Sequence, residues 1–110
     1  MSEYEFLATT IEGTVQEYRY VNPHCILVIK GRGENGAPTV WHLDGDPPAT
    51  VDRAGFGPNT FRPGDQLQLQ IQRLKSGKPG GFWNIRMVIK QNGHEFSGHQ
   101  CALSNTCDAP

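Results

Sequence analysis

A chain of 110 residues is the size of one domain, and its 13 glycines and 8 prolines favour short strands and turns over a bundle of long helices. The formal net charge of −1 argues against general binding to nucleic-acid backbones, since such binding depends on a basic excess. No apolar run reaches the roughly 18 residues of a membrane span, so the sequence predicts no transmembrane segment.

The first predicted element is a long strand over Glu5–Val21, where Thr and Tyr are frequent and apolar and polar residues alternate. Ile11, Gly13 and Val15 fall on one face, because successive side chains of a strand point to opposite sides. Gly13 favours a bulge or a sharp bend, which would let one strand serve two sheets. Asn22-Pro23 is expected to end the strand, since proline has no N–H for the ladder.

Two shorter strands are predicted next. The nearly continuous apolar run within His24–Gly31 indicates a second strand that is buried on more than one side. A polar connection with an Asn-Gly step, GRGENGAP, then leads to a third strand over Thr39–Asp44.

A short helix is expected over Asp46–Gly55. Asp46 can cap it by accepting a hydrogen bond from an early backbone N–H, and Pro47 then occupies the first helical position, where its missing donor costs nothing. Gly55 suits the left-handed residue just past the last turn. Beyond the helix, Arg62-Pro63-Gly64-Asp65 has the Pro and Gly of a type II turn.

The fourth predicted strand, DQLQLQIQRL, alternates apolar residues with glutamines, which is typical of a strand with one wet face. A flexible basic loop, KSGKPGG, separates it from the fifth predicted strand over Phe82–Gln91. This fifth strand places its apolar side chains on one face, at Trp83, Ile85, Met87 and Ile89. Asn92-Gly93 is expected to turn the chain into a short HEF segment.

Three strands, a helix and two strands is the element order of an OB-fold. We therefore predict an all-β protein, a small five-stranded Greek-key barrel of the OB type with one short helix between strands three and four. The alternative is another small antiparallel barrel in which the helix is incidental. Residues 1–96 are predicted to form this single domain, and residues 97–110, which show no periodicity, to form an irregular tail.

Several short motifs resemble a family of small bacterial proteins of unknown function. They are Gly13-Thr14-Val15, Asn22-Pro23-His24, Trp41, Pro48 with Arg53-Ala54-Gly55-Phe56, and Pro63-Gly64-Asp65. Members of this family usually carry an export signal, so the resemblance implies a barrel in the periplasm, and it implies no activity. The chain departs from the family in lacking an amino-terminal His-His-Ser segment and in having Phe56 where Trp is common. Its first residues lack the features of a secretory signal, which leaves a cytoplasmic location as the alternative.

The open face of the predicted barrel is the first candidate site, because OB-folds bind ligands on strands two and three and on the adjoining loops. Aromatic side chains there could stack on a planar ligand, and arginines could hold a carboxylate or phosphate. The candidates are Tyr18, Tyr20, Trp41, His42, Arg73 and Arg86, with the Lys75–Lys78 loop beside them. The structural alternative is that Trp41 and Trp83 are core residues and the cations are solvated.

A metal site is the second candidate. Copper or zinc could be bound by His24 and Cys25 together with His99 and Cys101, if the tail folds back on the second strand. The structural alternative is that His24 hydrogen-bonds the backbone and Cys25 fills a gap in the core. Cys101 and Cys107 could also close a small disulfide loop, or all three cysteines could be unpaired thiols.

No nucleophile motif and no phosphate-binding glycine pattern occurs in the sequence, so we expect a protein that is not an enzyme. The leading hypothesis is a binding or accessory module for a small molecule or a partner protein. A periplasmic copper- or zinc-binding protein is the alternative, and binding of single-stranded nucleic acid, disfavoured by the charge, is third.

Overall fold

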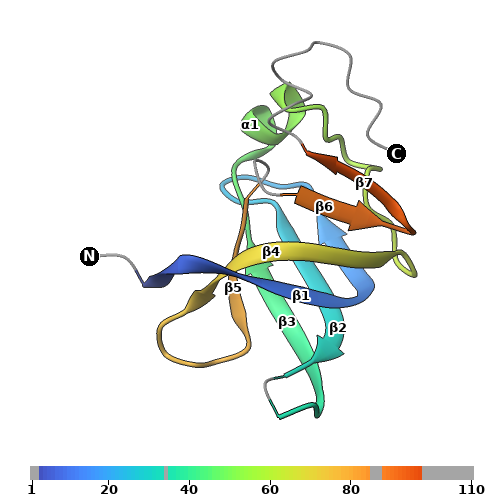
Figure 1. The fold of residues 1–110 in the computed structure, drawn as a ribbon. Coiled ribbons are helices and arrows are strands. Elements are labelled where there is room, and N and C mark those ends of the chain that lie inside the picture. The colour runs from blue at the N-terminus through green and yellow to red at the C-terminus, as the bar shows by residue number, and fades with distance from the viewer. Residues whose placement is uncertain (1–2, 34, 85–87, 98–110) are drawn as a thin grey trace.

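In the computed structural model, residues 3–33, 35–84 and 88–97 are described, and they form seven strands and one short helix (Figure 1). The elements are β1 Tyr4–Arg19, β2 Ile26–Arg32, β3 Pro38–Asp44, α1 Pro48–Arg53, β4 Gln66–Leu74, β5 Gly80–Trp83, β6 Val88–Gln91 and β7 His94–Ser97.

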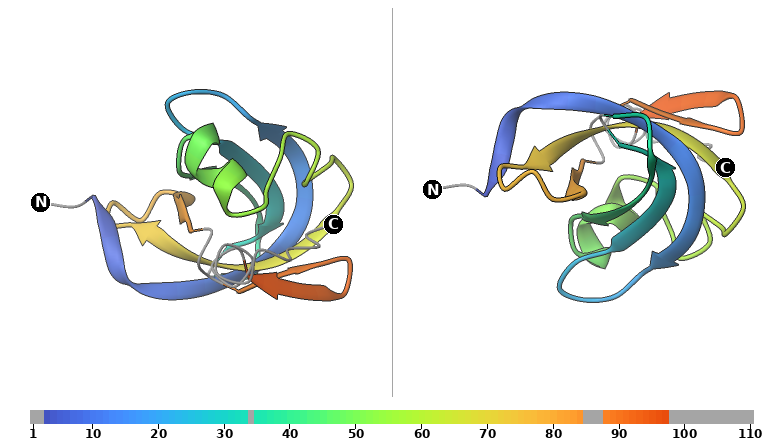
Figure 2. Two further views of the ribbon diagram at one scale, coloured as in Figure 1. Left: turned by 90° about the horizontal axis from the view of Figure 1, so that it is seen from above. Right: turned by 90° about the horizontal axis from the view of Figure 1, so that it is seen from below.

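The strands follow the order β1-β2-β3-β5-β4, and β4 pairs again with β1, so that five strands close into a barrel. The β3–β5 pair is parallel and the other pairs are antiparallel. Views along the barrel show α1 lying across one end (Figure 2). The predicted fold, a small all-β barrel of the OB type with one helix between strands three and four, is confirmed.

The barrel closes because β1 changes partner at Gly13. This residue lies opposite Leu67 of β4 on one side and opposite Gly31 of β2 on the other. A Cβ atom on Gly13 would collide with the carbonyl oxygen of Lys30, and one on Gly31 would collide with that of Glu12. The prediction that one strand serves two sides at Gly13 is thus confirmed, but the predicted bulge does not lie there: the register of β1 is irregular between Val15 and Glu17 against β2 and between Tyr4 and Ala8 against β4.

The interior of the barrel is filled by the apolar faces of the strands together with α1 and the segment that follows it. The alternation predicted for β4 is confirmed, since Leu67, Leu69 and Ile71 are buried. The fully buried side chains of greatest volume are Trp83, Phe56, Leu27, Ile29, Leu43, Leu69, Ile71 and Ile89.

The single fifth strand predicted over Phe82–Gln91 is wrong, because the structure divides it into β5 and β6. β5 pairs with the carboxyl-terminal part of β4 and, in parallel, with β3, which closes the barrel. β6 pairs with the amino-terminal part of β4 and then forms a hairpin with β7 through Asn92-Gly93. One straight strand cannot reach both β3 and β7. Ile85 and Met87 lie outside the described residues.

The start of the helix also differs from the prediction. Pro48, not Pro47, occupies the first turn, and Pro47 precedes the helix in an extended conformation with no side-chain cap. A residue before proline favours this conformation, so the Pro-Pro step delays the helix by one residue. Asp46 therefore does not cap the helix, and its carbonyl accepts a hydrogen bond from the amide of Cys25 at 3.0 Å.

The end of the helix agrees with the prediction. Gly55 has a φ of 96°, and its amide donates to the carbonyl of Asp52 at 2.9 Å. The amide of Phe56 donates to the carbonyl of Val51 at 3.0 Å, which completes a Schellman motif. This turn places the Phe56 ring in the core.

The type II turn before β4 is confirmed, with a φ of 98° at Gly64 and a hydrogen bond from Asp65 N–H to Arg62 C=O. The Asp65 carboxylate accepts hydrogen bonds from the Arg62 amide at 2.9 Å, Gln91 Nε2 at 2.7 Å and Asn92 Nδ2 at 3.2 Å. Burial alone would raise the pKa of Asp65, but these hydrogen bonds and the charge of Arg62 together lower it.

Asp65→Asn should lower the free energy of unfolding at pH 7 by about 1–3 kcal/mol, because it removes the charged acceptor of three hydrogen bonds. The folded-state pKa of Asp65 is depressed, so its contribution is present above the unfolded pKa of about 3.9 and is lost as the pH falls through the folded value. Urea denaturation of wild type and variant at pH 7 and near pH 3 measures this. Asp52→Asn, at an exposed position of α1, is the control. A loss of stability that does not depend on pH would contradict the prediction.

Gly13→Ala should lower the free energy of unfolding by about 1–3 kcal/mol, because the new methyl group would displace the backbone of β2. Gly57→Ala is the matched control, since no atom lies within 4 Å of the position its Cβ would take. Thermal and chemical denaturation of both variants measure the loss. Equal stability of the two variants would show that the β2 backbone does not exclude a side chain at Gly13.

Candidate functional site

The structure divides the predicted binding face into two groups of residues. Tyr18 and Tyr20 lie near α1, and Trp41 and Arg73 lie together on the strands nearer the β2–β3 hairpin. His42 is exposed on β3, beside Gly80 of β5. Arg86 lies outside the described residues, so its predicted role is untested.

Tyr18 and Tyr20 pack against the core. The Tyr18 ring meets Phe61 and Trp83 edge-on, with ring centroids 5.2 and 6.4 Å apart. Its hydroxyl is buried beside the Cys25 thiol and makes no hydrogen bond within the described residues. Burial, followed by the neighbouring Cys25 and Tyr20, raises the pKa of this hydroxyl. The Tyr20 hydroxyl donates to the carbonyl of Pro48 at 3.2 Å and so attaches the end of β1 to the helix.

Trp41 and Arg73 form a stacked pair on neighbouring parts of the barrel. The Trp41 ring is 3% exposed, and its indole N–H donates to the Arg32 carbonyl at 3.3 Å, which fixes its orientation. The Arg73 guanidinium carbon lies 5.5 Å from the ring centroid, within the range of a cation–π interaction.

A cavity of about 320 Å³ opens beside this pair, between the β2–β3 hairpin and the β4–β5 loop. It is lined by Gly33, Asn35, Thr39, Trp41, Arg73, Gly77 and Pro79. The side-chain oxygen of Asn35, Oδ1, accepts from the backbone amide of Ala37, and the Thr39 hydroxyl donates to the Ala37 carbonyl. This leaves an amide NH₂ group and a hydroxyl oxygen as polar groups of the wall.

The hairpin residues of this cavity were not among the sequence candidates. Asn35 and Thr39 read in the sequence as an ordinary turn and the start of a strand. Their position beside Arg73 depends on closure of the barrel, which no local pattern shows. The Lys75–Lys78 loop, one of the sequence candidates, contributes Gly77 to the wall.

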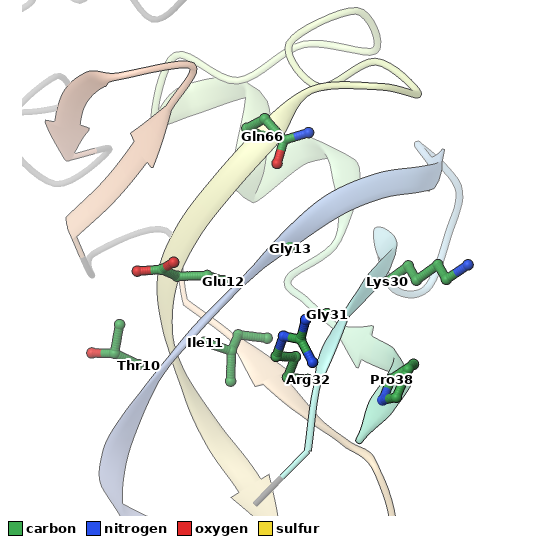
Figure 3. A pocket seen from close by; sticks show the side chains of 9 residues that line it. All are labelled: Thr10, Ile11, Glu12, Gly13, Lys30, Gly31, Arg32, Pro38 and Gln66. Carbon is green, nitrogen blue, oxygen red and sulfur yellow. The ribbon is translucent and has the colours of Figure 1, made fainter. Parts of the chain in front are cut away.

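A larger open cleft, of about 610 Å³, lies where β1 separates from β2 (Figure 3). Its lining joins consecutive residues of β1 to the end of β2 and the start of β3. These residues are Thr10, Ile11, Glu12, Gly13, Lys30, Gly31, Arg32, Pro38 and Gln66.

The described half of the predicted metal site has structural partners. His24 Nδ1 lies 3.0 Å from the Gly45 carbonyl oxygen, and Cys25 is fully buried. The pKa of the Cys25 thiol is raised, chiefly by burial. His99 and Cys101 lie outside the described residues, so the four-ligand copper or zinc site stays a prediction. Over residues 3–33, 35–84 and 88–97, no three His, Cys, Asp or Glu residues group as metal ligands.

The fold and the cavity define a small OB-type barrel with a polar pocket beside a stacked Trp–Arg pair. The chain belongs to the family of unknown function DUF6152, whose model matches residues 2–84. This confirms the resemblance to a family of unknown function. No curated protein and no solved structure matches the chain. None of the described helices has the length and apolar character to cross a membrane.

Tyr18→Phe should leave the free energy of unfolding unchanged or raise it by up to about 1 kcal/mol, because it removes a buried hydroxyl that makes no hydrogen bond. Tyr20→Phe is the matched variant, and it should lower stability by about 0.5–1.5 kcal/mol through loss of the bond to Pro48. Parallel urea denaturation curves compare them. A larger loss in Tyr18→Phe would show that its hydroxyl has a partner.

Proposed function

We propose that the protein is a binding module, not an enzyme, and that it holds a small anionic ligand in the cavity beside Trp41 and Arg73. The observation that carries the proposal is the Arg73 guanidinium stacked on the Trp41 face at the wall of a cavity. A guanidinium is a permanently charged, planar donor that matches the geometry of a carboxylate or phosphate.

The surroundings of the cavity support an anion. Lys75 and Lys78 are exposed in the β4–β5 loop that forms one wall, so their charges add to that of Arg73. Gly33 and Gly77 present backbone without side chains, so a ligand can approach the wall closely. The volume of about 320 Å³ is at the lower end of the range for ligand pockets and suits a small molecule.

The stacked pair also favours a ligand with a planar part. The Trp41 indole is held in place by its bond to the Arg32 carbonyl, and Arg73 covers its face. An aromatic carboxylate could lie against the outer side of the Arg73 guanidinium in place of water. Its negative charge would then pair with the guanidinium. An exported setting, expected from the family resemblance, is part of this proposal and is consistent with a carrier or accessory role.

Benzoate, inorganic phosphate and citrate are suitable probes, with neutral benzamide as the uncharged match of benzoate. Titration of ¹⁵N-labelled protein should shift the amides of residues 33, 35, 39 and 77 with at least one anion and not with benzamide. Arg73→Gln should weaken that binding by about tenfold or more, because it removes the charge that pairs with the ligand.

Arg73→Lys separates charge from shape, since lysine keeps the charge and loses the planar stack; intermediate affinity is expected. Arg53→Gln, on the exposed end of α1, is the control that removes an equal charge elsewhere. The proposal fails if no anion shifts the cavity amides, or if the variants at Arg73 and Arg53 bind equally.

A further inference from the structure

The cavity beside Trp41 and Arg73 has a second polar end, at the β2–β3 hairpin. Thr39 and Asn35 line this end together with Gly33. A Cβ atom on Gly33 would lie 2.7 Å from Thr39 Oγ1 and 3.6 Å from Asn35 Oδ1, so the two side chains converge on the same part of the wall. Among the described residues that line the cavity, Arg73 alone is charged. The cavity therefore has one cationic end and one neutral polar end.

The backbone of Ala37 fixes the hydrogen-bonding roles of both side chains at the neutral end. Its amide can only donate, so the Asn35 atom that faces it at 3.1 Å is the oxygen, and the Asn35 NH₂ group remains a donor. Its carbonyl can only accept, so the Thr39 hydroxyl gives its hydrogen to that carbonyl at 3.0 Å. The Thr39 oxygen keeps its lone pairs. The hairpin end thus offers one acceptor and one donor.

A hydroxyl group on the ligand matches this pair, because a hydroxyl donates one hydrogen bond and accepts others. It would donate to Thr39 Oγ1 and accept from the Asn35 NH₂ group. A methyl group in the same place would leave both side chains without partners, and a site built to bond a hydroxyl discriminates against the analogue that lacks it. A second carboxylate has no hydrogen for Thr39 and would place a charge at the end that no cation lines.

The spacing along β3 sets where the ligand hydroxyl must be. Thr39 and Trp41 are two residues apart on this strand, so their side chains lie on the same face, about 6.5 Å from each other along the strand. Arg73 lies over the Trp41 ring. A small ligand whose acid group is paired with Arg73 therefore reaches Thr39 only if its hydroxyl is at the end opposite to the acid.

We propose that the cavity selects a rigid aromatic acid with a hydroxyl group opposite its carboxylate, of which 4-hydroxybenzoate is the simplest. Arg73 pairs with the carboxylate, and Thr39 and Asn35 together bind the hydroxyl. This inference rests on the proposed function, and it adds a selectivity among anions that the charge of Arg73 cannot supply.

Isothermal titration calorimetry with 4-hydroxybenzoate and 4-methylbenzoate tests the selectivity, because the two acids have similar shape and differ in the hydroxyl. Wild type should bind 4-hydroxybenzoate about three- to tenfold more tightly. Thr39→Val keeps the branched shape and removes the oxygen, so it should abolish this preference and leave the affinity for 4-methylbenzoate unchanged or higher. Thr10→Val is the matched control at an exposed position of β1 outside this cavity, and it should keep the wild-type preference.

Two further variants complete the comparison. Arg73→Gln should weaken both acids by a similar factor and leave their ratio unchanged, since the carboxylate and the hydroxyl bind at different ends. Asn35→Ala, at an exposed position of the hairpin, should reduce the preference by removing the donor. Circular dichroism checks that each variant is folded.

The outcomes separate this inference from the function on which it rests. If neither acid binds wild type, the proposed anion site and the selectivity both fall. If both acids bind equally, or if Thr39→Val and Asn35→Ala both retain the preference of wild type, the anion site stands and the selectivity for a hydroxyl is overturned.

Discussion

The close approach of two backbones at Gly13 and Gly31 determines the rest of the architecture. Since neither residue has a side chain, β1 can pass within contact distance of β2 and continue along β4. Ile11 and Val15, two residues to either side of Gly13, are both buried. β1 therefore belongs to both sides of the barrel, and the five strands enclose a single interior.

The aromatic cluster at the α1 end of the barrel depends on that closure. Packing on this cluster is what stabilises a helix of only six residues. Phe56 and Phe61 lie with ring centroids 6.4 and 5.8 Å from Trp83, and Gly45 leaves room for the indole ring, which a Cβ would strike. The indole N–H of Trp83 donates to the Cys25 carbonyl at 3.2 Å. The helix thus covers one end of the core, to which it contributes Val51, and the turn that ends it places the Phe56 ring there.

Features set by neighbouring residues were predictable from the sequence. The alternation of β4, the glycine after the helix and the Pro63-Gly64 turn all follow from local conformational preferences, and the element order indicated the barrel. The division of the fifth strand was not predictable, because it depends on where β3 and β7 lie in space. For the same reason the sequence identified Trp41 and Arg73 as candidates but could not show that Asn35 and Thr39 would join them.

The parallel contact between β3 and β5 has a consequence for how the barrel opens. It holds three paired positions, His42 with Gly80 through Asp44 with Phe82, whereas β2 and β3 are paired at seven. β4 and β5 are also paired at only three positions, but parallel pairing is slightly less stable per residue than antiparallel pairing. Local opening follows the route that breaks the weakest interactions, so the parallel seam is where the closed barrel can relax into a curved sheet without unfolding. The β3–β5 seam borders the loop that walls the Trp41–Arg73 cavity. Local opening there would therefore widen the entrance to the cavity and leave the close approach of β1 and β2 at Gly13 and Gly31 intact.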